Sequence, residues 1–348
     1  MAQLIENNKK IGLPSNENHM NHIIEKALGY DHVYDPDFDL NGFIKSRLNH
    51  NVFVSGISGS GKSYLLSYLI KTSGSKKNFI FNFKPHDVYL DLNLDDSLVI
   101  DLSSSYIDPF SDFNSFLNAY LLAFKIDVSG IMSSSVPSIL FDYFSLYDGK
   151  MTLKQLNKSF LDKYGKNDVL GAAARVIASN IALLYHDFNF SSAFTSFVQY
   201  KYIIFDFSNL NEIQKTFFLE LSLHLVWNLI YGSDYDVSLF LDEISRLLFL
   251  DISIFNDIVR QIRAFGSLFV SSQNLSDVSP LVLNQFDTIL TFRTSIKSDF
   301  DLADSFFTNP NFPLSLKVTF SYLPVHSFFI LQNWIYDDLH SLYYQVVD

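Results

Sequence analysis

The stretch that decides the fold is VFVSGISGSGKSYLLSYLI, residues 52–70. It begins with three apolar residues, continues through a run of glycine and serine, and ends in leucine-rich sequence. A short apolar run bounded by turn residues predicts a buried strand, and leucines three and four residues apart predict a helix. The stretch therefore predicts a strand, a tight loop and a helix in direct succession.

The loop at residues 56–63 fits the Walker A pattern of phosphate-binding loops, G-x-x-x-x-G-K-[ST]. Its glycines allow positive φ angles and a close backbone approach, and N–H groups at a helix start donate to phosphate. We expect Lys62 to reach the β- and γ-phosphates of ATP and the Ser63 hydroxyl to ligate Mg²⁺. The alternative is a structural glycine turn, but the flanking strand and helix patterns favour the phosphate loop. The predicted nucleotide-binding residues are Gly56, Ser58, Gly59, Ser60, Gly61, Lys62, Ser63 and Tyr64.

A second predicted strand ends in two carboxylates. Residues 237–243 read VSLFLDE. We expect Asp242 to hold Mg²⁺ through water, as a Walker B aspartate does, and Glu243 to orient or deprotonate the attacking water. Apolar runs that end in two acids are common, so this interpretation depends on the phosphate loop. The adjacent glutamate favours ATP hydrolysis over a GTP switch, and the chain contains no guanine-reading N-K-x-D motif.

A third apolar run ends in polar residues. Residues 267–274 read SLFVSSQN, which predicts a strand followed by Gln273. In this order after the phosphate loop and the acid pair, Gln273 is expected to sense the γ-phosphate or to position water. A glutamine after a strand is more often an ordinary surface residue when it occurs without such partners.

The remaining pattern predicts an α/β fold. Short apolar runs bounded by turn residues and separated by helical spacing indicate a mainly parallel sheet flanked by helices. They occur at 78–83, 97–102, 201–208 and 287–293. Residues 106–196 carry helical spacing with few strand signals, which predicts an all-helical insertion. The tail at 315–334 predicts a C-terminal β extension of two strands, arranged as a hairpin at the sheet edge.

These patterns divide the chain into three parts. Residues 1–50 form an N-terminal extension that ends in a helix near 41–50. The nucleotide-binding core comprises residues 51–105 and 197–348. The helical insertion occupies residues 106–196 between its two halves.

Composition restricts the classes of protein. Hydrophobic residues make up 48% of the 348 residues, enough for a large core, and the absence of cysteine excludes disulfides and thiolate metal sites. The polar N-terminus has no signal core and no apolar run reaches membrane-spanning length, so we expect a cytoplasmic protein without a membrane span. The net charge of −12 argues against a surface that coats nucleic acid, but not against a local basic groove or a ring pore.

The order of these motifs resembles the HerA/FtsK superfamily of additional-strand P-loop ATPases. Residues 259–266, VRQIRAFG, followed by SLFVSSQNLSDVSP, are similar to that superfamily's R-(K/A)-x-G…S/T-Q-x-P-S-D signature. The segment YIIFDFSNL, 202–210, is similar to a strand followed by D-x-S-x-L in HerA-like and TraG-like coupling ATPases. The chain departs from the family in two places: Asn274 and Leu275 follow Gln273 where a proline is expected, and Asn82 stands where the family has an aspartate.

The resemblance implies a RecA-like core that assembles into a homo-oligomer, most often a hexameric ring with ATP at the subunit interfaces. Arg263 or Arg293 would then reach a neighbouring site as an arginine finger and stabilise charge on the transferring phosphate. The alternative for each arginine is an ordinary surface or intrachain salt bridge.

Members of this superfamily move polymers, so the leading hypothesis is an ATP-driven translocase of duplex DNA, as in packaging, conjugation or DNA processing. Sequence-independent contacts to backbone phosphates would hold the DNA. The alternatives are a motor of the same fold acting on protein in secretion, and an ATP-dependent assembly or coupling factor with little hydrolysis. An all-helical insertion carries partner recognition in coupling ATPases, so residues 106–196 are a candidate protein-binding region. Their aromatic residues, as in FDYFSLY, equally fit core packing.

Overall fold

The computed structural model describes most of the chain from residue 40 onward, and residues 1–39 lie outside the described part. The described ranges are 40–47, 49–85, 89–90, 92–104, 107–129, 134–164, 168–185, 199–231, 236–244, 253–306, 320–321, 327–332 and 343–345. In the predicted N-terminal extension, α3 (Leu40–Lys45) overlaps the helix expected near 41–50. No helix among these residues is long and apolar enough to cross a membrane.

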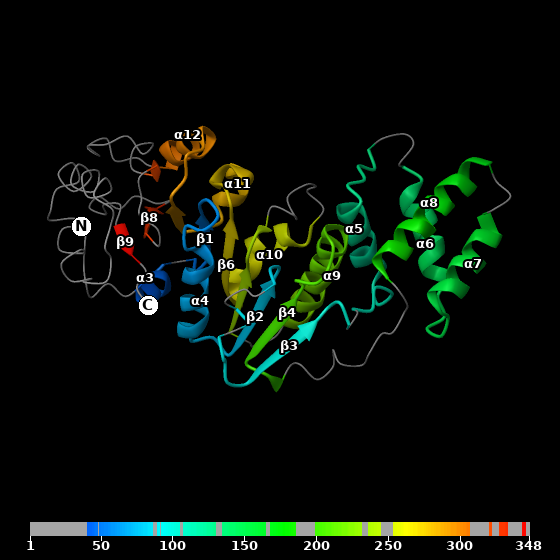
Figure 1. Ribbon diagram of the computed structural model, residues 1–348, viewed down its shortest axis with the longest axis horizontal. Helices are drawn as coiled ribbons and strands as arrows, with labels where there is room; N and C mark the ends of the chain where they lie inside the picture. The colour runs from blue at the N-terminus through cyan, green and yellow to red at the C-terminus, as the bar shows by residue number, and fades with distance from the viewer. Residues whose placement is uncertain are drawn as a thin grey trace.

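One sheet runs through the described residues, with strand order β3-β4-β2-β5-β6-β1-β7-β8-β9 (Figure 1). All neighbours from β3 to β7 pair in parallel, and the two pairs that involve β8 are antiparallel. The strands are β1 (Val52–Ser55), β2 (Lys77–Asn82), β3 (Ser97–Asp101), β4 (Tyr202–Asp206), β5 (Val237–Leu241), β6 (Gly266–Ser272), β7 (Thr288–Phe292), β8 (Ser327–Gln332) and β9 (Tyr343–Gln345).

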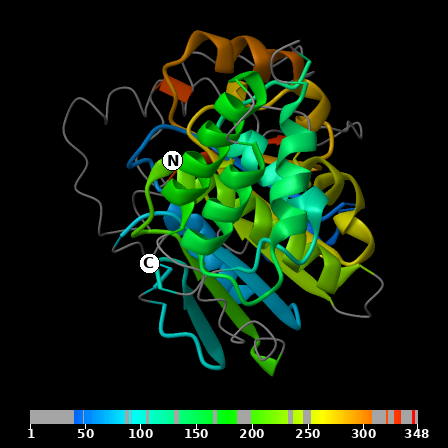
Figure 2. The same cartoon turned by 90° about the vertical axis from the view of Figure 1, so that its right-hand side faces the viewer.

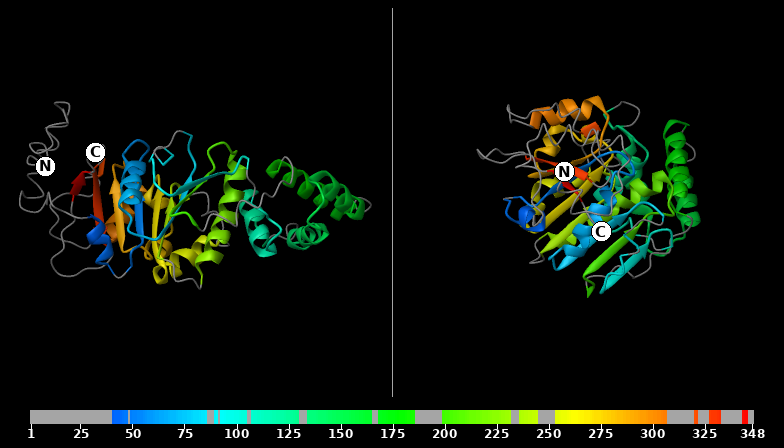
Figure 3. Two further views of the ribbon diagram at one scale, coloured as in Figure 1. Left: turned by 90° about the horizontal axis from the view of Figure 1, so that it is seen from below. Right: turned by 60° about the vertical axis from the view of Figure 1, so that its left-hand side comes forward.

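Four strands of the parallel part of the sheet, β1, β4, β5 and β7, are short, largely apolar and fully buried. Such strands must be covered on both faces, because each pleat turns successive side chains to opposite sides. Phe53, Phe79 and Phe81 face a core shared with the helices that follow β3 and β4. Val54 and Ile80 face a second core with α4 (Lys62–Thr72), the helix that follows the glycine-rich loop. Helices therefore cover both faces of the sheet (Figure 3).

The long helix α9 (Glu212–Ile230) supports the first of these cores. Asn211 begins it with a capping box, in which its side chain accepts from Gln214 N (3.0 Å) and Gln214 Oε1 accepts from Asn211 N (3.2 Å). The helix is apolar on nearly all sides and largely buried. The other helices described after β5 are α10 (Phe255–Gln261), η5 (Ile262–Ala264), η6 (Leu275–Asp277), α11 (Pro280–Leu283) and α12 (Lys297–Phe306).

Between β3 and β4 the described residues form four α-helices: α5 (Phe113–Ala123), α6 (Val136–Leu146), α7 (Leu153–Tyr164) and α8 (Asp168–Leu184). They gather at one end of the molecule, where α5 packs along α9 (Figures 1 and 2). Most of the aromatic side chains described there are buried in the core or pack against it, and Tyr143 is fully buried. Phe141 is an exception, because 52% of its surface is exposed.

The C-terminal strands extend the sheet beyond β7. β8 pairs antiparallel with β7, and β9 pairs antiparallel with β8 at the edge. The predicted second strand of the tail is thus β8, but its partner β9 lies further along the chain than the sequence predicted. The beginning of the predicted tail, at residues 315–319, lies outside the described residues. The predicted class, a mainly parallel α/β sheet with helical insertion and β extension, is confirmed.

Candidate functional site

The glycine-rich loop connects β1 to α4 at the carboxyl end of the sheet. Gly56, Gly59 and Gly61 have φ angles of 145°, 77° and 113°, which side chains rarely adopt. A Cβ atom built on Gly56 would lie 2.5 Å from the Cβ of Phe292 on β7. Glycine is therefore required there both for its conformation and for the close approach of β7.

Lys62 begins α4 and folds back over the loop. Its ammonium donates to the carbonyl oxygens of Gly56 (2.5 Å) and Ile57 (3.1 Å). Burial lowers the pKa of this ammonium below its ordinary value, and the nearby Asp242 carboxylate opposes part of that shift. The loop thus holds a buried cation against its own carbonyl groups.

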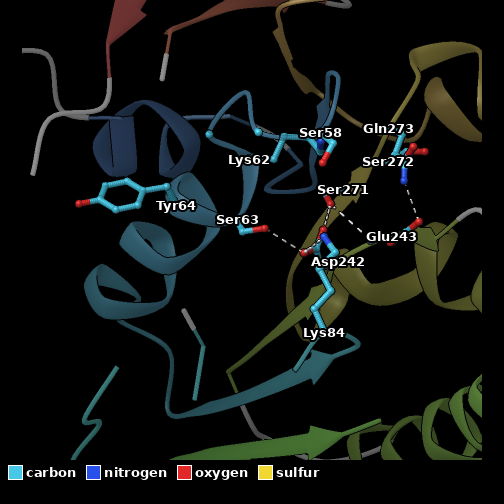
Figure 4. A pocket seen from close by; sticks show the side chains of 12 residues that line it. Ser58, Lys62, Ser63, Tyr64, Lys84, Asp242, Glu243, Ser271, Ser272 and Gln273 are labelled. Carbon is cyan, nitrogen blue, oxygen red and sulfur yellow. Dashed lines mark hydrogen bonds and ion pairs between the residues drawn. The ribbon is translucent and has the colours of Figure 1, made fainter. Parts of the chain in front are cut away.

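Asp242 follows β5 and receives hydrogen bonds from several elements (Figure 4). Its Oδ2 accepts from Ser63 Oγ (3.1 Å), Tyr89 OH (3.3 Å) and Lys84 Nζ (3.4 Å). Its Oδ1 accepts from Ser271 Oγ on β6. Only 4% of the Asp242 side chain is exposed, so these donors compensate the cost of burying its charge.

Glu243 turns sharply out of the strand. Its φ angle is 70°, an uncommon value for a residue other than glycine, and its N–H donates to Ser271 O (3.0 Å). Its side chain accepts a hydrogen bond from Gln273 Nε2 (3.0 Å). Strained backbone of this kind concentrates at functional sites, where neighbouring structure must hold it in place.

The segment after β6 fixes Gln273 from both sides. Ser272 Oγ donates to Asp277 Oδ2 (2.6 Å), and the Asn274 backbone and side-chain amides donate to the two oxygens of the same carboxylate (3.1 and 3.0 Å). Asp277 belongs to η6, so this short helix anchors the residues that flank Gln273. The glutamine is thereby presented from a tightly held turn.

Loop, helix start and strand ends together surround a pocket of about 250 Å³. The lining residues are Ser58, Gly59, Gly61, Lys62, Ser63, Tyr64, Lys84, Asp242, Glu243, Ser271, Ser272 and Gln273. Of the predicted binding residues, Gly56 and Ser60 lie behind this lining. Figure 4 shows the Tyr64 ring directed away from Asp242.

The chemistry of the pocket fits a nucleotide phosphate group with a magnesium ion. Ser63 and Asp242 supply the hard oxygen ligands that Mg²⁺ requires. The buried Ser60 hydroxyl, although it is not part of the pocket lining, belongs to the same loop and has no hydrogen-bond partner within the described ranges. Loop N–H groups and the Lys62 ammonium add donors of positive potential.

The two candidate arginines are both exposed. They lie at opposite ends of the parallel strands, because Arg293 follows a strand and Arg263 precedes one. Arg293 directly follows β7, and its carbonyl accepts from the N–H of Ile57 in the glycine-rich loop (3.0 Å). Arg263 lies in η5, just before β6 begins. The length of that seven-residue strand separates it from the pocket by roughly 20 Å. Neither arginine lines the pocket of its own chain.

Three contacts of Asp242 were not among the predicted site residues. Lys84 follows β2, and its position beside β5 gives a signal, since side chains after neighbouring parallel strands meet at one edge. Ser271 was visible only as part of the polar end of β6. Nothing in the local sequence around Tyr89 indicates that its hydroxyl reaches Asp242.

Comparison with known proteins establishes the fold. No protein-family model and no curated protein sequence matches the chain. Among solved structures, VirB4 of Thermoanaerobacter pseudethanolicus is 16% identical, with 86% of this chain and 90% of VirB4 covered at a TM-score of 0.62. The plasmid coupling protein TrwB in complex with ADP and Mg²⁺ is 14% identical, with 96% and 92% covered and a TM-score of 0.62.

TrwB in complex with the ATP analogue ADPNP is also similar, at 14% identity with 85% and 84% covered and a TM-score of 0.58. At such low identity the similarity establishes a shared fold. It confirms the predicted RecA-like P-loop architecture.

Proposed function

We propose that this chain is a Mg²⁺-dependent ATPase that uses hydrolysis to move duplex DNA. One observation carries the proposal: the ends of three adjacent strands bring Lys62, Asp242 and Gln273 to one pocket, together with Ser63 and Glu243. A phosphate-binding loop, a metal-binding carboxylate and a candidate base are the parts that phosphoryl transfer to water requires.

Binding would rearrange the charges of the pocket. The Lys62 ammonium would exchange the loop carbonyls for phosphate oxygens, which removes the cost of its present burial. Ser63 and Asp242 would hold Mg²⁺, which supplies charge neutralisation to the phosphates when bound. The left-handed glycines would keep the loop open enough for its N–H groups to donate.

Hydrolysis would depend on the pair that Gln273 and Glu243 form. The carboxylate of Glu243 accepts a hydrogen bond from the Gln273 amide. In the proposed reaction this carboxylate would take up a proton from water beside the γ-phosphate. Gln273 would orient that water or sense the γ-phosphate. Both roles depend on the position of Gln273 beside Glu243 in the pocket.

The choice of DNA, and of a ring, rests on the fold and the motif order. TrwB is a conjugative coupling protein, and the superfamily that the motifs resemble forms hexameric rings that move polymers. In such a ring, exposed Arg293 or Arg263 would act on a neighbour's nucleotide, since neither reaches the pocket of its own chain. Residues 106–196 would remain available to a protein partner.

Steady-state ATP hydrolysis, measured with and without long duplex DNA, tests the proposal. We expect DNA to raise the rate several-fold, with the stimulation weakening as salt increases because counterions compete for the phosphates. Lys62→Ala should abolish nucleotide binding. Glu243→Gln should retain binding and lose hydrolysis, because an amide cannot take up a proton.

Other outcomes would redirect the assignment. Hydrolysis that both variants abolish but DNA does not change would keep the ATPase and reject DNA as the polymer. Stimulation by a protein partner alone would indicate a protein motor. Hydrolysis by Lys62→Ala at the unmodified rate would overturn the nucleotide site itself.

A further inference from the structure

A second lysine occupies the pocket. Lys84 extends from the end of β2 toward Asp242, and its Nζ lies 3.4 Å from Asp242 Oδ2 (Figure 4). The same oxygen accepts the hydroxyl of Ser63. An ammonium therefore lies on the carboxylate oxygen that, together with Ser63, is the expected Mg²⁺ site.

The fold fixes the backbone beneath this lysine. Buried Asn82 donates from Nδ2 to the carbonyl of Lys84 (3.2 Å) and to Asp206 Oδ1 (2.9 Å) at the end of β4. Asp206 Oδ1 also accepts from Ser208 N (3.0 Å). An aspartate at position 82 would place two carboxylates side by side here, so the asparagine suits the buried pairing.

The charges around Asp242 favour a second cation beside it. Asp242 is almost fully buried, while the Lys62 ammonium is turned toward the carbonyls of Gly56 and Ile57. An ionised carboxylate in this place requires a compensating charge. Lys84 provides one, and because 49% of its side chain is exposed, it can leave Asp242 without being desolvated elsewhere.

We propose that Lys84 is the counter-ion of Asp242 in the nucleotide-free site and yields that carboxylate to Mg²⁺ when magnesium and nucleotide bind. The proposal rests on the proposed function and adds a positioning residue to it. The positive charge of Lys84 beside the Asp242 carboxylate reduces the repulsion between that carboxylate and the nucleotide phosphates before a metal ion binds. Lys84 therefore matters most for binding without magnesium.

Equilibrium binding of a fluorescent ATP analogue, in excess Mg²⁺ and in EDTA, tests this assignment. For Lys84→Met we expect affinity in EDTA to fall about fivefold, in line with a partly exposed ion pair. In excess Mg²⁺ the change should be less than about twofold, because the metal supplies the charge. The affinity in excess Mg²⁺ divided by the affinity in EDTA should therefore rise.

Two variants serve as controls. Lys84→Arg keeps the charge and should preserve the wild-type ratio. Lys154→Met removes an exposed lysine from α7, far along the chain from the pocket, and should leave both affinities unchanged. Circular dichroism would establish that each variant is folded.

The outcomes separate the two levels of inference. If Lys84→Met leaves the ratio unchanged, whether both affinities fall equally or neither falls, the counter-ion assignment is wrong and the nucleotide site stands. If the unmodified chain binds no nucleotide in either condition, the proposed function fails and the assignment fails with it.

Discussion

Gln273 Nε2 donates a 3.0 Å hydrogen bond to Glu243 Oε1 and so joins the turns that follow β6 and β5. The bond links the residue expected to sense the γ-phosphate with the residue expected to act as base. It also constrains a side chain whose backbone is held at a positive φ angle. The two residues therefore form one unit, and a substitution of Gln273 should change how Glu243 acts as a base.

Gln273→Glu tests this unit through the pH dependence of hydrolysis. Two carboxylates at this distance repel, which raises the pKa of the pair. Because the base must be unprotonated, kcat should be low at neutral pH and should recover as pH rises through the raised pKa. Gln273→Ala lacks the second charge, so its lower kcat should follow the wild-type pH profile; parallel profiles for all three proteins would contradict the prediction.

Gly56→Ala tests the close approach of the glycine-rich loop to β7. The new Cβ would lie 2.5 Å from the Cβ of Phe292, so the loop must shift and nucleotide binding should fall by at least about tenfold. Gly149→Ala is a matched control, because Gly149 has a φ of 81° with open space around it. It should cost about 1 kcal/mol of stability and leave binding intact. Equal binding by both variants, measured by calorimetry, would show that the loop tolerates the clash.

Sequence predicted well the features that local pattern specifies. The apolar runs of β1, β5 and β6 are buried strands, and the glycine spacing around Lys62 forms the expected loop. Because the carboxyl ends of parallel strands meet at one edge, the convergence of Asp242 and Gln273 follows from the strand assignment. The role of each side chain in the chemistry remains a prediction.

Features set by distant contacts were less accessible. The hydroxyl of Tyr89 reaches Asp242 across more than 150 residues, and no local pattern encodes that approach. β9 has three residues and is defined by pairing with β8, so it carries little periodic signal of its own. Arg263 is far from the pocket because it precedes β6, whereas the pocket lies at the carboxyl end of that strand. The motif spacing alone does not predict this distance.

Glu220→Ala should destabilise the fold more than any surface change on the same helix. The fully buried Glu220 on α9 accepts from Ser253 Oγ (2.7 Å) and Ile254 N (2.8 Å), at the start of α10, and its Oε1 lies 3.3 Å from His224 Nε2. Losing this acceptor would leave buried donors unpaired, at a cost of about 3 kcal/mol in the free energy of unfolding.

Glu212→Gln on the same helix is the comparison. Its ion pair with Lys215 leaves the glutamate 68% exposed, so the cost should stay below about 1 kcal/mol. Urea unfolding of both variants would measure the difference. Equal costs would mean that Glu220 does not hold the start of α10.

The buried tyrosines of the helical region predict an alkaline loss of stability. Burial raises the pKa of Tyr120 to about 12, although the amide of Asn180 lowers it in part, and burial also raises the pKa of Tyr143. Each folded-state pKa exceeds the unfolded value near 10, so the folded state retains protons that the unfolded state releases. Stability from these groups is full below pH 10 and is lost as pH rises toward the folded pKa. Between pH 8 and pH 11 each should remove about 1 kcal/mol from the free energy of unfolding.

Tyr120→Phe isolates this effect. At pH 8 the variant should lose about 1 kcal/mol, because the 2.9 Å hydrogen bond between Asn180 and the hydroxyl disappears. Between pH 8 and pH 11 its stability should fall less steeply than that of the unmodified chain, since no phenol remains there to ionise. Tyr68→Phe, which alters a tyrosine that is 39% exposed on α4, should reproduce the unmodified slope. Urea unfolding at both pH values measures the three slopes, and a Tyr120→Phe slope equal to the unmodified one would show that this hydroxyl does not resist ionisation in the folded chain.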